Sequence, residues 1–527
     1  MFRVPMVRGL RAPAAAARRH GAAAGAAAVK APAPPVASTL PVPTFSEVKF
    51  KKEDVEQVML ELPEFNFYEM KEDSPNPYKG TTMDRSILIS PPQPSLVAPK
   101  LEFSKLENGL KVASIDKQGL TASLGLFVSA GSRFETVANL GVSNMVSMMA
   151  YRSTAHLSHL RTVKTLEQLG ANSTATCIAG REETSYQVSV LREFVPLVVP
   201  LMIGNVLFPR LLPWEVKDAS KQVKVERAAL AGDADAMVNE MLHKAAYFNN
   251  TLGQSPVASE RSLAYFNQDT IRSYLMDHFA PERMVLVGVN VAHSELAKWA
   301  MRSFVDYNAI PLKDREAAKA VYMGGDLRND VNSPFCHAAL GLESVPWGQA
   351  ELAPVSLLRT ILGAGSANSK GISSDSISRL QKQIIEQNPY VESCAAFNTS
   401  YSDGGLFGVY GVSQAAKSGD MAISMAKTLK SLTTVSADEL AIAKAALKVK
   451  MFRDSDDDLK LMKDLGQQLL LTGTYGSASD FAKMIDAVTP AQLTAAATKL
   501  LSSKLTFVAH GDNTALPHYS AIEAALK

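Results

Sequence analysis

Three residues of this chain, Asn144, Ser147 and Met148, have a spacing that could carry metal chemistry. Residues i, i+3 and i+4 of a helix are neighbours on one face. This spacing would suit two metal ligands and a general base if the three residues were His, Glu and His. The amide of Asn and the thioether of Met are poor ligands for Zn²⁺, and the hydroxyl of Ser is no base at neutral pH. The sequence therefore predicts a helix that keeps the spacing of a metal site without its ligands.

The neighbouring segments explain why these residues should lie on a helix. Residues 122–130 have the composition of a buried strand, and residues 131–133 favour a turn. Ser143 is a residue type that caps helices, so we expect the helix to cover residues 144–151. The predicted order is a strand, a turn and then the helix with the three candidate positions.

The histidines of the chain offer few other ligands. His156 and His159 lie just beyond the predicted helix, and a relocated zinc site that uses them is the alternative. His243, His278 and His293 have no partners at ligand spacing, so we expect them to have structural roles.

The surroundings of the helix resemble the M16 (pitrilysin-like) peptidases. The shared strings are Ala130-Gly131-Ser132-Arg133-Phe134-Glu135, Asn139-Leu140-Gly141 and Ser153-Thr154. The inverted zinc motif of that family, HxxEH, falls on positions 144–148, and its distal glutamate ligand falls at about Glu226. The resemblance implies a peptidase fold in which Asn144, Ser147, Met148 and Glu226 have no catalytic role and hold no metal. No other cofactor is expected.

A Gly- and Ser-rich loop, residues 361–371, is the second segment with a chemical interpretation. Its spacing is not that of the phosphate-binding loop GxxxxGK[ST], so nucleotide binding is not expected. In the α subunit of the mitochondrial processing peptidase, a family member, the corresponding loop is richer in glycine and is thought to contact presequences. Here Gly363, Gly365 and Gly371 remain, and the resemblance implies a residual substrate-binding site at these three residues.

Other strings resemble the α-type branch of the family. This branch comprises that α subunit and core protein 2 of the cytochrome bc1 complex. Matching strings begin at Ser158, Leu169 and Trp214. Residues 396–410 predict a β-hairpin with its turn at residues 402–405, and they are similar to core protein 2.

The resemblance to this branch implies that the chain is a non-catalytic core subunit of mitochondrial ubiquinol–cytochrome c reductase (complex III). In that role it would be a matrix-side scaffold for the assembly and stability of the complex. The expected partners are a β-type M16 subunit (core protein 1), cytochrome b, cytochrome c1 and the Rieske protein. Attachment to the inner membrane is expected to be peripheral, through these partners. The alternative is the α subunit of the processing peptidase, which recognises presequences without cleaving them, and one protein can have both roles. The sequence has no pattern of haem or iron–sulfur ligands.

The expected fold class is α+β, with two tandem homologous M16-type domains that form a half-shell, each a mixed β-sheet covered by helices. The strand pattern at residues 284–289 returns at residues 505–509. The helix pattern before it, which begins with Asn267 as a cap and runs through residue 278, returns at residues 489–501. The expected boundaries are a transit peptide at 1–40, a Pro-rich extension at 41–95, domain 1 at 96–305, a linker at 306–320 and domain 2 at 321–527.

The composition indicates a protein of the mitochondrial interior. Residues 1–40 are basic and rich in Ala, and no acidic residue precedes Glu47, which resembles a mitochondrial transit peptide. The three cysteines form no CxxC pair, which favours a reducing compartment. The 54 Lys and Arg nearly balance the 52 Asp and Glu, so no nucleic-acid partner is expected. No apolar run is long enough to span a bilayer, and the expected location is the matrix side of the inner membrane.

Overall fold

The computed structural model describes residues 45–48, 100–171, 174–248, 250–263, 265–304, 318–367 and 378–527. The chain divides into two compact units, Met1–Ala37 and Ser38–Lys527, and every described residue belongs to the second. The segment predicted as a transit peptide lies outside the described residues, as do most of the extension, most of the linker and Gly371.

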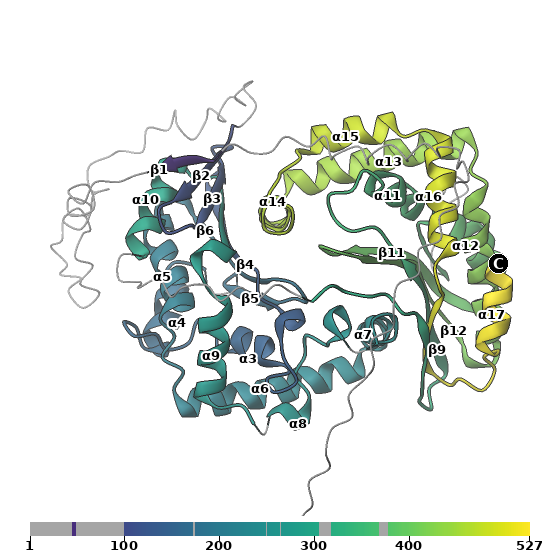
Figure 1. Cartoon of the computed structure of the whole chain (residues 1–527), viewed down its shortest axis with the longest axis horizontal. Coiled ribbons are helices and arrows are strands. Elements are labelled where there is room, and N and C mark those ends of the chain that lie inside the picture. Colours follow the sequence, from purple (N-terminus) through teal and green to yellow (C-terminus); the bar gives the residue numbers. More distant parts are fainter. Residues whose placement is uncertain are drawn as a thin grey trace, which may run out of the picture. The chain divides into compact units, whose positions relative to one another are not determined.

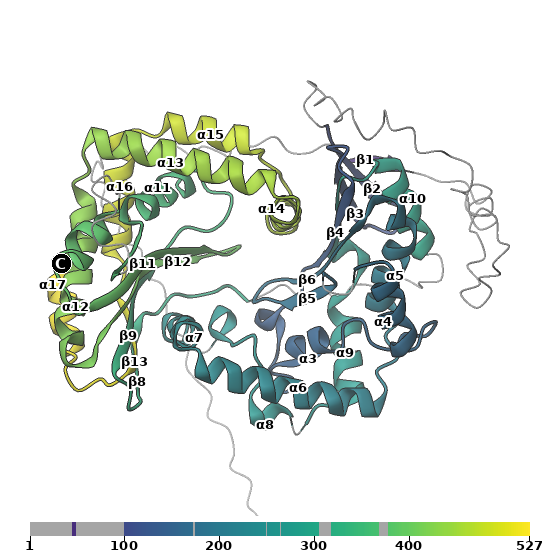
Figure 2. The same ribbon diagram turned by 180° about the vertical axis from the view of Figure 1, so that it is seen from behind.

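Two mixed β-sheets organise the described residues (Figures 1 and 2). The strands of the first sheet, in spatial order, are β1 (Ser46–Val48), β2 (Leu101–Leu106), β3 (Lys111–Ile115), β7 (Met284–Val289), β4 (Thr121–Val128), β6 (Thr184–Leu191) and β5 (Thr176–Ala179). Those of the second sheet are β10 (Ala364–Ser366), β11 (Val391–Ser400), β12 (Gly405–Gln414), β9 (Phe335–Glu343), β13 (Thr506–Gly511) and β8 (Gly325–Asp330). The predicted α+β class is confirmed.

The two sheets repeat one topology. In the first, β3 is parallel to β7, and β7, β4, β6 and β5 follow as antiparallel neighbours. In the second, β8 is parallel to β13, and β13, β9, β12 and β11 follow as antiparallel neighbours. Five successive strands thus have the same order and directions, which confirms the prediction of two tandem homologous domains.

Each domain also contributes its own set of helices. Those of the first domain are α3 (Val142–Met148), α4 (His159–Gln168), α5 (Val195–Leu207), α6 (Pro213–Gly232), α7 (Ala234–Ala246), α8 (Glu260–Leu263), α9 (Gln268–His278) and α10 (His293–Ser303). Those of the second domain are α11 (Leu352–Leu362), α12 (Ser418–Lys430), α13 (Ala437–Asp456), α14 (Asp458–Leu471), α15 (Ala478–Ala487), α16 (Pro490–Ser502) and α17 (Tyr519–Leu526). None of the described helices has the length and hydropathy needed to cross a membrane.

Local signals set several of these boundaries. Asn267 caps α9 by accepting a hydrogen bond from the backbone N–H of Thr270, as its residue type predicts. Within the acidic run 454–458, Asp457 caps α14 through the N–H groups of Leu459 and Lys460. An acidic run favours a helix N-terminus, and Asp457 and Asp458 form one here, whereas Asp454 and Asp456 belong to the end of α13.

Each sheet is covered on one face by helices of its own domain and on the other by a helix of the opposite domain (Figures 1 and 2). Helix α14 packs on the first sheet through Leu461, Met462, Leu465 and Leu469, against a set that includes Phe127, Val285 and Val287. Helix α7 packs on the second sheet through Val238, Met241 and Leu242, against Ala339, Leu406 and Val508. The two domains therefore exchange one helix each, which the sequence did not predict.

The close approach of α14 to the first sheet depends on Gly466. A Cβ added there would overlap the ring of Phe127, whereas a Cβ added to Gly204, inside α5, would meet nothing within 4 Å. Gly204→Ala should therefore stabilise the protein by about 1 kcal/mol through helix propensity. Gly466→Ala should instead destabilise it by about 1–3 kcal/mol, because overpacking outweighs the same propensity gain. Chemical denaturation of both variants measures the difference, and equal effects at the two sites would contradict the packing of α14.

Strand β1 lies inside the segment predicted as an extension. It pairs in parallel with β2, and the hydroxyl of Ser46 donates to the backbone oxygen of Phe103 at 3.0 Å. The ring of Phe45 lies edge-on to that of Phe103, with 5.6 Å between the centroids. Part of the segment between residues 41 and 95 therefore belongs to the first sheet.

Candidate functional site

Helix α3 carries the three candidate positions, and a buried carboxylate fixes where it begins. The helix starts at Val142 after Gly141, whose φ of 87° lies in the left-handed region that favours glycine. The Glu135 carboxylate accepts hydrogen bonds from the N–H of Gly141 at 2.6 Å, the N–H of Ser143 at 2.8 Å and the hydroxyl of Ser143 at 2.6 Å. The prediction that Ser143 caps the helix is wrong. Ser143 lies in the first turn, and the longer Glu135 side chain reaches the free N–H groups from outside the helix.

Glu135 should give the protein a measurable pH dependence. Burial raises the pKa of Glu135 to about 7, although its three hydrogen-bond donors act in the opposite direction. An unfolded chain releases this proton near its ordinary pKa of 4.5, so the folded state binds more protons between these two values and loses stability as the pH rises through them. The loss approaches about 3 kcal/mol above pH 7.

Glu135→Gln removes the titrating group, so the difference in unfolding free energy between the parent and the variant should change by most of that amount between pH 5 and pH 8, since the loss begins near pH 4.5. Urea titrations at each pH measure this difference. A constant difference across the range would mean that Glu135 stays ionised in the fold.

Asn144 lies beside Glu226, as the family resemblance implies for these two positions. The side-chain amide of Asn144 donates to Oε2 of Glu226 at 2.9 Å, and Asn144 is 4% exposed. Residue 144 is on α3 and Glu226 is on α6, so this hydrogen bond joins the two helices. An amide–carboxylate hydrogen bond thus connects the positions that a metal ion would bridge if residue 144 were a histidine.

The other two candidate positions serve the helix itself. The hydroxyl of Ser147 donates to the backbone oxygen of Asn144 at 2.8 Å. Met148 is half-buried and packs against the core of the first domain. Next to it, Arg152 donates to the side-chain oxygen of Gln222 on α6 at 2.7 Å. Of these contacts, the hydrogen bond from Arg152 to Gln222 reaches α6.

The nearby histidines also have protein partners. Nδ1 of His159 lies 3.3 Å from the backbone oxygen of Tyr151, and the ring of His156 lies edge-on to that of Phe208. In the part of the chain that the structure describes, no three His, Cys, Asp or Glu side chains are placed to hold a metal ion.

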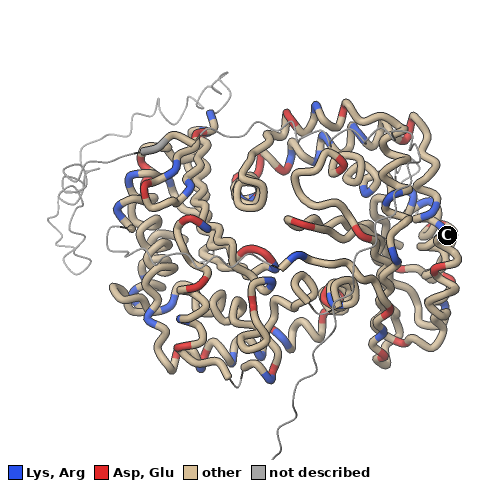
Figure 3. Tube along the Cα trace, viewed as in Figure 1, with Lys and Arg blue, Asp and Glu red and all other residues tan. Residues whose placement is uncertain are grey.

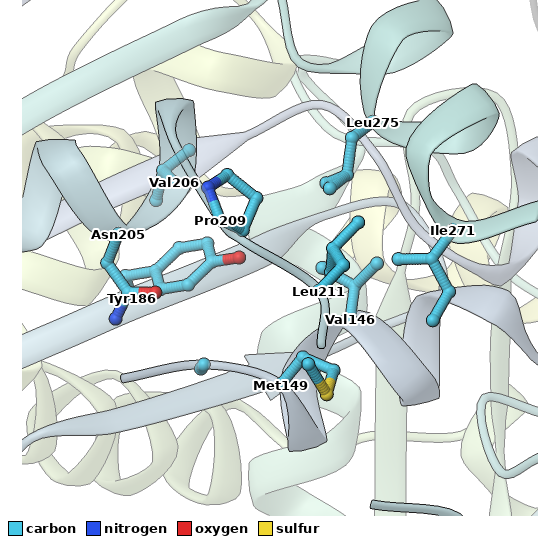
Figure 4. Close-up of a pocket in the computed structure, with 10 residues that line it drawn as sticks. Val146, Met149, Tyr186, Asn205, Val206, Pro209, Leu211, Ile271 and Leu275 are labelled. Atoms are coloured by element: carbon cyan, nitrogen blue, oxygen red, sulfur yellow. The ribbon is translucent and has the colours of Figure 1, made fainter. Parts of the chain in front are cut away.

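A small cavity lies behind α3, on the side of the core (Figure 4). Most of the side chains around it are aliphatic, including Val146, Leu211 and Ile271, and Asn205 and Tyr186 are its polar members. Its volume is about 10 Å³, close to the space that one water molecule needs. This cavity is therefore a packing defect and no substrate site.

A buried ionic cluster joins the two domains and was missed from the sequence. This Arg133 cluster consists of Arg133, Glu182, Ser402 and Asp403. The Arg133 guanidinium pairs with both carboxylates and donates to the hydroxyl of Ser402 at 3.0 Å, and Ser402 donates its backbone N–H to Glu182 at 2.9 Å. Burial lowers the pKa of Arg133, but the bonds to the two carboxylates outweigh it and leave the pKa above its ordinary value. Elsewhere along the described trace, charges of both signs are interspersed (Figure 3).

Arg133 belongs to the string shared with the family. Ser402 and Asp403 lie in the predicted hairpin turn, which spans residues 401–404 because Gly405 already begins β12. The sequence therefore marked both ends of the cluster but not their contact, because about 270 residues separate them.

The two described glycines of the second candidate segment have structural partners. Gly363 follows α11 with a φ of 70°, and a Cβ there would press on Ser378. Gly365 lies on β10, where a Cβ would overlap the side chain of Gln381. Close packing accounts for both glycines, and Gly371 lies outside the described residues.

Two sequence families match this chain. Residues 111–259 match the family described as "Insulinase (Peptidase family M16)", and residues 265–447 match "Peptidase M16 inactive domain". The chain belongs to peptidase family M16. Together the matches cover more than half of its length, and the second runs from α9 of the first domain into the second domain.

Relatives of two kinds are similar to this M16 protein. The α subunit of the mitochondrial-processing peptidase of Solanum tuberosum is 32% identical over 449 residues, covering 84% of this chain and 88% of that protein. Human cytochrome b-c1 complex subunit 2 is 31% identical over 425 residues, covering 80% and 91%. The two identities are nearly equal, and both relatives are mitochondrial by name.

The fold also matches a solved structure. A chain of complex III2 from Candida albicans, bound to Inz-5, superposes with a TM-score of 0.71 at 19% identity, covering 81% of this chain and all of that one. At this identity the match supports the M16 fold.

Proposed function

We propose that this chain is a non-catalytic core subunit of mitochondrial complex III, of the core protein 2 type. The observation that carries the loss of catalysis is the hydrogen bond between Asn144 and Glu226. It occupies the place where an M16 peptidase needs ligands for Zn²⁺, and neither Ser147 nor Met148 supplies a base or a second ligand. The helix that would carry the chemistry is instead a packing element between the sheet and α6.

The role in complex III is supported by the similarity to cytochrome b-c1 complex subunit 2 and by the packed state of Gly363 and Gly365. As such a subunit, the chain lies on the matrix side of the inner membrane, beside a β-type M16 subunit, cytochrome b, cytochrome c1 and the Rieske protein. Residues 1–40 act as its transit peptide, and residues 306–320 link domain 1 (96–305) to domain 2 (321–527).

The second candidate is the α subunit of the mitochondrial processing peptidase, because the relative with that name is 32% identical. In that role the chain presents presequences to a zinc-bearing β subunit, with Gly363, Gly365 and Gly371 in contact with the substrate. One protein can also have both roles.

Native electrophoresis of gently solubilised mitochondria separates the two candidates. The band that holds this chain should contain cytochrome b, cytochrome c1 and the Rieske protein by mass spectrometry. Migration as a heterodimer with a β-type M16 subunit alone would overturn the complex III assignment in favour of the processing peptidase. A presequence cleavage assay on the same band then decides whether both roles are present.

A further inference from the structure

Helix α13 has apolar residues on two opposite faces. One face packs into the second domain through Leu440 and Ala443, which are buried, and through Leu447 and Met451, which are half-buried. The other face carries Ile442, Ala445, Val449 and Phe452, which we call the outer stripe. Three of its side chains are strongly exposed: Ile442 at 49%, Val449 at 68% and Phe452 at 46%. A helix of a soluble domain ordinarily has one apolar face, so the second face requires an explanation.

The spacing of the outer stripe is that of a helix-docking seam. Its positions follow at i, i+3, i+7 and i+10, which places them in one row along about 15 Å of the helix. Single exposed apolar residues are normal on a protein surface, but a contiguous row marks an interaction site.

The corresponding helix of the first domain has no such row. Helix α6 is also 20 residues long and occupies the same place in the repeat. Its exposed Trp214 and Val225 are separated by Asp218 and Lys221, which form an ion pair at 2.8 Å. The fold alone therefore does not require an apolar outer face on this helix, and the outer stripe is specific to α13.

The charged residues of α13 between positions 440 and 453 are all basic. Between Glu439 and Asp454, α13 carries Lys444, Lys448, Lys450 and Arg453 and no acidic residue. Lys448 is held by Asp486 of α15 at 2.8 Å, on one side of the stripe. Lys450 and Arg453 lie three residues apart on the other side. Burial and the neighbouring Arg359 and Arg453 lower the pKa of Lys450, whereas Asp454 raises it. Asp454 is itself paired with Lys460 at 3.0 Å, so cations outnumber carboxylates at this edge of the stripe. A ligand that covers the stripe should place carboxylates against this edge.

We propose that the outer stripe of α13 docks an amphipathic helix of a partner subunit, whose apolar row is flanked by Asp or Glu residues that face Lys450 and Arg453. The outer stripe would pack against the apolar row of the partner helix, and the basic edge of α13 would favour a partner helix with acidic residues beside that row. The partner helix needs about three turns to cover the stripe. The inference rests on the proposed function only in that the chain works as a subunit, and either assembly named above satisfies it.

Site-specific photo-crosslinking in the intact assembly tests the proposal. The full chain is expressed in its own mitochondria with p-benzoylphenylalanine in place of Val449, and with the same group in place of Leu160, an exposed residue of α4, as the control. Position 449 should cross-link to one partner subunit, within a peptide in which acidic and apolar residues alternate at helical spacing. Position 160 should not form that cross-link.

Three outcomes would overturn the proposal. They are a cross-link to the acidic segment 53–73 of the same chain, a cross-link to a second copy of this chain, and no cross-link from position 449 above that of the control. The native gel above identifies the assembly independently, so a failure of this docking site is distinguishable from a failure of the proposed function.

Substitution provides a second readout. Val449→Glu should lower the amount of the cross-linked subunit that co-purifies with the chain at least about fivefold, because a charge replaces the centre of the apolar row. Leu160→Glu is the matched control and should have no effect. Circular dichroism melting of both variants checks that they fold. Unchanged co-purification of a folded Val449→Glu variant would also overturn the proposal.

Discussion

Replacing Arg133 with Met should lower the free energy of unfolding by about 3–5 kcal/mol, the cost expected when one partner of a buried ion pair is removed. The Arg133 side chain is 3% exposed, and its guanidinium also donates to the backbone oxygen of Ala318 at 2.7 Å. Without it, Glu182 and Asp403 would remain as two neighbouring carboxylates with little solvent around Glu182, whose side chain is 7% exposed.

The matched control is Lys221→Met, which removes an exposed pair with Asp218 on α6 and should leave stability unchanged within error. Urea denaturation followed by near-ultraviolet circular dichroism measures both variants. A small loss for Arg133→Met would mean that water enters the cluster and solvates the carboxylates.

The double variant Arg133→Met with Asp403→Asn tests the contact between the domains directly. If the two residues interact as the structure shows, their effects should be non-additive, with the second substitution restoring part of the loss. Additive effects would mean that Arg133 acts within the first domain alone, through Glu182.

The Arg133 cluster and the exchanged helices have the same consequence for the molecule. Helix α14 of the second domain completes the core on one face of the first sheet, and α7 completes the reciprocal core. The cluster adds a directional contact at the turn that holds Ser402 and Asp403. Fixed domains would suit the proposed scaffold role, because a scaffold gains nothing from opening.

Much of this architecture follows from local sequence patterns. The strand at 284–289 and the helix after Asn267 are as predicted, because a continuous apolar run and a side-chain cap act within a few residues. The duplication was also readable, since the same helix–strand pair, α9–β7 and α16–β13, returns near the end of each repeat. Helix α10 was missed, because its N-cap is Ala292, which makes no side-chain capping bond.

Contacts between distant segments could not be predicted in the same way. The apolar face of α14 is visible in the sequence, but nothing local specifies that it covers the first sheet instead of the second. Glu135 was noticed only as part of a shared string, since its role as a cap depends on the path of the turn between β4 and α3. The contact between Asn144 and Glu226 was accessible only through the family resemblance, because 82 residues separate them.

Restoring histidines to α3 should create a zinc site in this chain. In the combined variant Asn144→His, Ser147→Glu and Met148→His, the two histidines stand at i and i+4, and Glu226 already lies within hydrogen-bond distance of the first position. Three protein ligands and an open position complete the coordination of a catalytic-type zinc site. We expect the parent chain to bind no stoichiometric zinc and the variant to bind about one zinc per chain, in a pH-dependent manner because the histidines must be neutral.

Metal analysis after dialysis against a weak chelator measures the stoichiometry, and isothermal titration measures the affinity. Adding Glu226→Gln to the combined variant is the matched control and should weaken zinc binding at least about tenfold, since a neutral amide replaces the anionic ligand. Zinc binding that is indifferent to this change would place the metal elsewhere, and tight zinc in the parent chain would contradict the loss of the site. Zinc binding by the combined variant that depends on Glu226 would show that the backbone of an M16 metal centre remains in this protein. It would also show that substitution of three side chains is enough to restore metal binding to α3.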